Sequence, residues 1–104
     1  MKLRYFYDAG SGICLWAGDD EATEKYGYPV LLEKLPLSKK TVSIGNELIN
    51  RFDTSIDREY PPGPSRWNEE EKSRFAIDSN SFYSLVVEEL AHTYDIENEV
   101  GIIS

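Results

Sequence analysis

The sequence predicts an α+β fold, built as one small domain over residues 1–104. In this fold an N-terminal β-hairpin and a C-terminal strand form a small sheet that packs against two longer helices and one short helix. Two observations lead to this prediction. Large apolar residues alternate with other residues near both ends of the chain, which is typical of half-buried strands. Between the ends, apolar residues recur at helical spacing in two long segments.

The strand pattern lies at the two ends of the chain. KLRYFYD at residues 2–8 alternates Leu, Tyr and Tyr with Arg and Phe, and ICLWAG at residues 13–18 sets Leu15 opposite Trp16. The AGSG between them supplies two glycines that permit the positive φ values of a tight reversal, so these segments predict a hairpin. YDIENEVGIIS at residues 94–104 alternates again and predicts a last strand that pairs with the hairpin.

A short helix and an irregular connector follow the hairpin. Asp19 or Asp20 is a candidate N-cap, because a short carboxylate accepts hydrogen bonds from the free N–H groups of a first turn. The helix after it is closed by Gly27. YPVLLEKLPLS at residues 28–38 contains two prolines that break a continuous helix, yet it is too apolar to lie in solvent. It predicts a packed connector with one helical turn.

A first long helix is predicted from about Lys39 to Ile56, with Ser38 as its candidate cap. Gly45 weakens this prediction, because glycine disfavours a helix interior. Two lysines in the first turn oppose the helix dipole and favour a start nearer Ser43. The apolar residues that recur at helical spacing here are Val42, Leu48, Ile49, Phe52 and Ile56.

The second long helix has the clearest start in the chain. Asn68 followed three residues later by Glu71 matches a capping box, and the three glutamates of the first turn suit the positive end of the helix dipole. We expect the helix to end near His92 or Thr93. Its buried face is predicted to consist of Phe75, Phe82, Tyr83, Val86, Val87 and Leu90.

Charge and composition exclude several kinds of partner. The formal net charge of −8 repels phosphate backbones and anionic headgroups, so we expect no direct binding to nucleic acid or to a membrane. A basic protein partner would be attracted, although the same charge can serve solubility alone. Cys14 is the single cysteine, which fits a reducing compartment, and no apolar run has the length of a signal peptide or a membrane span. We therefore expect a cytoplasmic protein.

No cofactor or metal site is expected. His92 and Cys14 are the chain's single histidine and single cysteine, too few for a zinc cluster and without a spacing that suggests a catalytic pair. A pair of carboxylates remains the one enzymatic alternative. The nineteen acidic residues stand mostly in hydrophilic runs, however, so they point to solvated faces and helix caps.

The stretch YPPGPSRWNEEE at residues 60–71 leaves two interpretations open. Its prolines end one helix, and its glutamates begin the next. Tyr60 and Trp67 bracket the bend, and each combines a large ring with a polar group. Rings that point inward fix the bend to the core. A ring that points outward among glutamates and aspartates is an anchor for a basic protein surface.

Several segments together resemble a family of short bacterial proteins. They are CLWAGDDEATEKYGYPV, EKLPLS, FDTSID and YPPGPSRWNEEE, followed by a long helix that ends in VEELAHTYDIEN. Small acidic proteins of this kind are similar to the immunity proteins of polymorphic toxin and contact-dependent growth inhibition systems, which bind and neutralise a cognate toxin domain. The resemblance spans nearly the whole chain but supplies no toxin-binding residues.

The resemblance and the charge together favour an immunity protein that binds a basic toxin domain stoichiometrically and occludes it, without turnover. A small carboxylate-dependent enzyme and a general protein-interaction module are the alternatives. The residues predicted to bind the partner are Asp19, Asp20, Asp57, Glu59, Tyr60, Trp67, Glu69 and Glu70.

Overall fold

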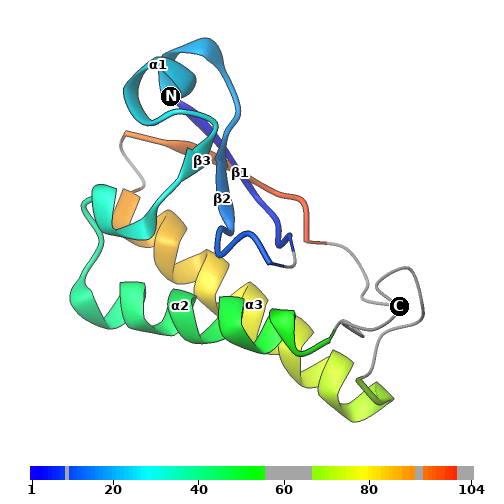
Figure 1. Ribbon diagram of the computed structural model, residues 1–104. Coiled ribbons are helices and arrows are strands. Elements are labelled where there is room, and N and C mark those ends of the chain that lie inside the picture. The colour runs from blue at the N-terminus through cyan, green and yellow to red at the C-terminus, as the bar shows by residue number, and fades with distance from the viewer. Residues whose placement is uncertain (9, 56–66, 91–92, 101–104) are drawn as a thin grey trace.

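The computed structural model describes residues 1–8, 10–55, 67–90 and 93–100. It confirms the α+β class: a four-stranded mixed sheet lies over two long helices, and a short helix lies beyond the end of the sheet (Figure 1). The elements in chain order are β1 (Lys2–Tyr5), β2 (Leu15–Ala17), α1 (Asp20–Tyr26), β3 (Pro29–Val30), the 3₁₀ turn η1 (Leu32–Lys34), α2 (Lys39–Asp53), α3 (Glu69–Leu90) and β4 (Asp95–Asn98).

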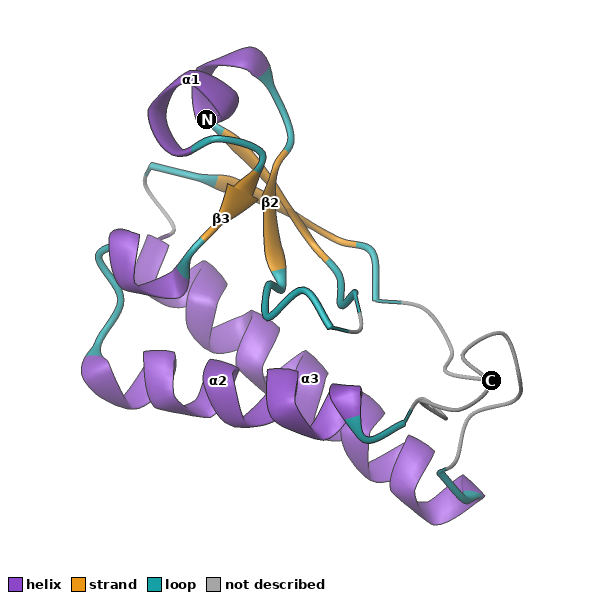
Figure 2. Cartoon of the chain, in the orientation of Figure 1, coloured by secondary structure: helices purple, strands orange, loops and turns teal. Residues whose placement is uncertain are grey.

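The sheet has the strand order β3-β2-β1-β4 (Figure 2). β1 pairs antiparallel with β2, as a hairpin requires, and parallel with β4, so the predicted pairing of the last strand with the hairpin is confirmed. β3 was not predicted. It consists of two residues of the connector that pair with Leu15 and Trp16. Two residues are too few to show an alternating pattern, and a proline argues against a strand.

The alternation along β1 and β2 separates two faces of the sheet. Leu3, Tyr5 and Leu15 are buried in the core that lies against α2 and α3. The ring of Tyr5 lies 5.8 Å from that of Phe82 in α3, which joins the two layers. We call the opposite side of the sheet the outer face. Arg4 and the residues paired with it, Trp16 and Glu97, lie there.

α1 begins and ends as predicted. The carboxylate of Asp19 accepts a hydrogen bond from Ala22 N at 2.8 Å, and a second from Lys2 N at 2.8 Å, which ties the helix to β1. Gly27 ends the helix with a φ of 82°, a conformation that favours glycine.

α2 begins at Lys39, so the alternative start near Ser43 is wrong. Ser38 caps the helix through a bond from Thr41 N to its hydroxyl at 3.2 Å. Glu89 of α3 adds a carboxylate at the same helix end: Ser38 N donates to it at 2.6 Å, and the Thr41 hydroxyl donates to it as well. This negative charge offsets the two lysines of the first turn. The helix ends at Asp53, and Ile56 lies outside the described residues.

Gly45 marks the place where α2 packs most closely. A Cβ atom there would lie 2.5 Å from Leu32 Cδ1 and 2.7 Å from Phe82 Cζ, closer than carbon atoms approach one another. Leu32 and Phe82 are both buried, so neither can move away freely. The glycine that weakened the helix prediction is therefore the residue that lets η1, α2 and α3 meet.

α3 begins with the predicted capping box. Glu71 N donates to Asn68 Oδ1 at 2.8 Å, and Asn68 N donates to Glu71 Oε1 at 3.3 Å. The helix ends at Leu90. Of the two predicted ends, His92 lies outside the described residues, and Thr93 lies in a turn beyond the helix. Phe75, Phe82, Val86 and Leu90 are buried as predicted, and Ser79 joins them.

β4 lies at an edge of the sheet. Asp95 N donates to the carbonyl of Met1, just before β1, and Glu99 N donates to the carbonyl of Tyr5 in β1, so the carbonyl of Ile96 points to the free edge. It accepts a hydrogen bond from the hydroxyl of Tyr83 in α3 at 2.7 Å. Within the described ranges no helix is both long enough and apolar enough to cross a membrane.

We expect Gly45→Ala to lower the free energy of unfolding by about 1–3 kcal/mol, because the added methyl group overpacks the crossing. In an uncrowded helix the same change stabilises by about 0.5–1 kcal/mol, so the sign of the effect is diagnostic. Urea unfolding measures it. Asn46→Ala, at the exposed neighbouring position, serves as the control and should not destabilise. A Gly45→Ala variant as stable as the wild type would contradict the close crossing.

We expect Glu89 to contribute stability that depends on pH. Hydrogen bonds from the Thr41 hydroxyl and from Ser38 hold the pKa of Glu89 below its ordinary value of 4.5. The contribution is therefore fully present above that value and is lost as the pH falls through the lowered folded-state pKa. Glu89→Gln should cost about 1 kcal/mol at neutral pH, and the difference from wild type should shrink on acidification. Urea unfolding from about pH 7 to about pH 3 tests this. Glu88→Gln is the control, and a difference that persists at low pH would contradict the assignment.

Candidate functional site

Trp67 faces the core. Its side chain is 8% exposed and packs on Phe75, with the ring centroids 4.9 Å apart. Its Nε1 donates to Thr54 Oγ1 at 3.1 Å, and Thr54 Oγ1 donates to the carbonyl of Arg51 at 2.6 Å. The sequence left open whether the Trp67 ring points inward or outward, and in the structure it points inward. Tyr60 lies outside the described residues.

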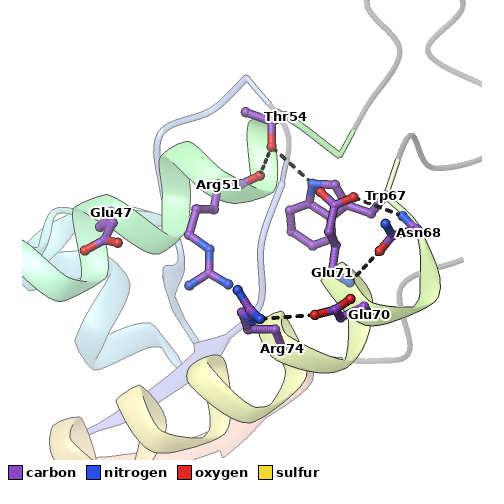
Figure 3. Close-up of a pocket in the computed structure, with 8 residues that line it drawn as sticks. All are labelled: Glu47, Arg51, Thr54, Trp67, Asn68, Glu70, Glu71 and Arg74. Atoms are coloured by element: carbon purple, nitrogen blue, oxygen red, sulfur yellow. Dashed lines mark hydrogen bonds and ion pairs between the residues drawn. The ribbon is translucent and has the colours of Figure 1, made fainter.

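A pocket of about 620 Å³ lies between the C-terminal end of α2 and the N-terminal end of α3 (Figure 3). Trp67 forms part of its wall, and the remaining side chains are polar or charged. The lining residues are Glu47, Arg51, Thr54, Trp67, Asn68, Glu70, Glu71 and Arg74.

The charges of the pocket are largely paired. Arg51 donates to Asp78 Oδ2 at 2.8 Å, and its guanidinium lies 5.6 Å from the centre of the Phe75 ring. Arg74 donates to Glu70 Oε1 at 3.2 Å in an exposed pair one turn apart. Exposed pairs of this kind contribute only about 0.3–0.5 kcal/mol, so Glu70 can exchange this partner at little cost. Three glutamates against two arginines leave the lining slightly acidic.

The structure brings three of the predicted partner-binding residues together. Glu69 and Glu70 stand in the first turn of α3 with 92% and 79% of their side chains exposed, next to the buried Trp67. Asp19 and Asp20 are not near them. They belong to the start of α1, at the end of the molecule away from the first turn of α3 (Figure 1). The other predicted residues, Asp57, Glu59 and Tyr60, lie outside the described residues.

The carboxylates with shifted pKa values all have structural hydrogen bonds. The N–H of Ala22 lowers the pKa of Asp19. The Arg4 guanidinium lowers the pKa of Glu99 in the same way. Burial raises the pKa of the Cys14 thiol to about 12, so it stays protonated at neutral pH. In the described parts of the chain no three His, Cys, Asp or Glu side chains cluster as metal ligands would. What these parts offer is ion pairing and a recess, which suit a binding surface.

One set of side chains with functional potential was not predicted. On the outer face of the sheet, the ring of Trp16 contacts that of Phe6 and that of Tyr28. The alternation in residues 2–8 and 13–18 already separated Phe6 and Trp16 from the core-facing residues, and this was the available signal. It could not show that the two rings meet, because that depends on the register of β1 and β2.

The chain is similar to one described protein family. The family model described as Serratia CdiI immunity protein-like matches residues 1–98. No curated protein matches the chain.

We expect truncation of Trp67 to act on stability. Trp67→Ala removes a buried ring and should cost about 3–5 kcal/mol. Trp67→Phe keeps a ring against Phe75 but loses the bond to Thr54, and it should cost about 1–2 kcal/mol. Urea unfolding of both variants measures the difference. A Trp67→Ala variant with wild-type stability would show that the ring is not part of the core.

Proposed function

The chain belongs to the Serratia CdiI immunity protein-like family, and we propose that it binds and neutralises the toxin domain of a contact-dependent growth inhibition system. The observation that carries this proposal is the extent of the family match. Residues 1–98 include every helix and strand that the structure describes, so the match extends over the whole described fold and not over one motif.

The proposed mechanism is stoichiometric occlusion of a basic toxin surface. The net charge of −8 attracts such a surface over a distance and repels nucleic acid and anionic lipid. Glu69 and Glu70 are strongly exposed beside the α2–α3 pocket, where they add local negative charge. Their expected contribution is to the rate of association, because exposed charges steer an encounter more than they strengthen the final complex.

The proposed location is the cytoplasm, where the buried free thiol of Cys14 is compatible with reducing conditions. The alternative of a carboxylate-dependent enzyme has little support in the described residues. A general acid at neutral pH requires a raised carboxyl pKa, whereas the shifts of Asp19, Glu89 and Glu99 are all downward.

The proposal predicts that the reading frame directly upstream of this chain's gene encodes the toxin domain, and co-expression with that domain tests the function. We expect the chain to restore growth of cells that produce the toxin domain. The purified proteins should elute together from a sizing column as an equimolar complex. If growth is not restored and no complex forms, the proposal is overturned.

Neutralising Glu69 and Glu70 should slow association. The double variant Glu69→Gln, Glu70→Gln removes local negative charge without placing a positive charge at the start of α3. We expect an association rate about 3–10-fold lower at low salt, and a smaller difference at high salt. Stopped-flow mixing with the toxin domain measures it.

The matched control is Glu24→Gln, Glu88→Gln, which changes the net charge equally at exposed positions away from the pocket. If both double variants slow association to the same extent, only total charge matters. In that case the local role of Glu69 and Glu70 is wrong.

A further inference from the structure

The outer face of the sheet carries a row of aromatic rings. Phe6 and Trp16 lie nearly parallel, with ring centroids 4.8 Å apart and planes 6° apart, and Trp16 contacts Tyr28 at 5.1 Å. Trp16 Nε1 donates to the carbonyl of Phe6 at 3.1 Å, so its polar group is satisfied within the row. We call Phe6, Trp16 and Tyr28 the aromatic row. Its central ring is buried by its neighbours and does not belong to the core cluster between the sheet and the helices.

No described helix covers this row. In Figures 1 and 2, α2 and α3 lie on one side of the sheet and α1 lies beyond its end. Tyr28 is 47% exposed and Leu31 45% exposed, two of the four exposed large hydrophobic residues in the described ranges. Pro29 pairs with Trp16, and alternation along the extended chain puts Leu31 on the same side as Pro29, opposite the buried Val30. The β3 side of the outer face is therefore apolar and open to solvent.

The β4 side of the same face is charged. In the register of β1 and β4, Asp95 lies opposite Lys2 and Glu97 lies opposite Arg4, so all four side chains lie on the outer face. Lys2 Nζ lies 3.5 Å from Glu97 Oε2, in an exposed ion pair that Glu97 can exchange for another basic side chain at little cost. Asp95 and Glu97 are exposed. Together with Glu99 they outnumber the two basic residues. This acidic row lies two strand spacings from β2, roughly 10 Å, so one partner surface can contact both rows.

Arg4 shows how this face holds a guanidinium. Its Cζ lies 5.2 Å from the centre of the Phe6 ring. Its Nη2 donates to Glu99 Oε1 at 2.8 Å, and its Nε donates to Oε2 of the same carboxylate. A planar cation is thus held between a ring face and a carboxylate. Tyr28 offers a second and more exposed ring at the other end of the row.

We propose that the outer face is the docking surface for the toxin domain, with the aromatic row as the desolvated centre of the interface and the β4 carboxylates as its acidic side. This inference rests on the proposed function. The occupant is a positively charged toxin surface that lays an arginine side chain on Tyr28 and Leu31 and directs a second basic side chain to Asp95 and Glu97. Charge complementarity selects it, because the face joins exposed rings to an excess of carboxylates on a chain of net charge −8.

The two surfaces then have separable effects on binding. Exposed carboxylates at the start of α3 act mainly on the association rate, whereas a ring buried at the centre of an interface acts mainly on the dissociation rate. Trp67 cannot supply such a ring without leaving the core, because it is packed on Phe75.

Truncation of Tyr28 tests the docking surface. We expect Tyr28→Ala to raise the Kd for the upstream-encoded toxin domain at least ~10-fold, mostly through faster dissociation. Tyr28→Phe keeps the ring and should stay within about 2-fold of wild type. Leu31→Ala should weaken binding about 3-fold or more. The matched control is Ile77→Ala, which truncates an apolar side chain of α3 that is 66% exposed and should leave the Kd unchanged.

Surface plasmon resonance gives the rates, and urea unfolding confirms that each variant is folded. If Tyr28→Ala does not fold, the dissociation rate of Leu31→Ala tests the docking surface in its place. If the folded Tyr28 and Leu31 variants dissociate at the wild-type rate, the docking surface is wrong. The proposed function is unaffected by that result, because the wild-type complex still forms. If Ile77→Ala raises the Kd as much as Tyr28→Ala does, the docking surface is also wrong. Absence of a wild-type complex would be a failure of the proposed function itself.

Discussion

The contact between the bare backbone of Gly45 and the ring of Phe82 sets how closely α2 approaches α3. Phe82 also lies against Tyr5 of β1, so the same ring fixes the distance from the helices to the sheet. Leu32 meets Gly45 from the connector that follows β3. Because Gly45 has no side chain, α2, α3 and the connector that contains Leu32 pack closely around one point.

Local signals in the sequence predicted much of the fold, because they depend on neighbours within a few residues. The capping box of Asn68 and Glu71 and the cap of Asp19 on α1 are of this kind. The start of α2 was uncertain because its decisive carboxylate, Glu89, is fifty-one residues from Ser38. β3 was missed because two residues carry no period, and only their pairing with β2 defines them. Such long-range partners do not appear in a local pattern.

The candidate site divides in the same way. Sequence reasoning could find acidic, exposed first turns, and it placed Glu69, Glu70 and Asp20 in them. It could not tell that α1 and the first turn of α3 lie at different ends of the molecule, nor which way Trp67 turns. The aromatic row depends on the register of two strands. Each of its rings was visible in the sequence, but their contact was not.

Each edge of the sheet has one feature that disfavours pairing with a further strand. Pro29 begins β3 without an N–H group to donate, and at the other edge the Tyr83 hydroxyl already occupies the Ile96 carbonyl of β4. Exposed strand edges are the usual starting point for edge-to-edge aggregation. An incoming strand would find no N–H donor on Pro29 and an occupied carbonyl on Ile96, so two copies of the chain gain little by pairing edge to edge at these positions.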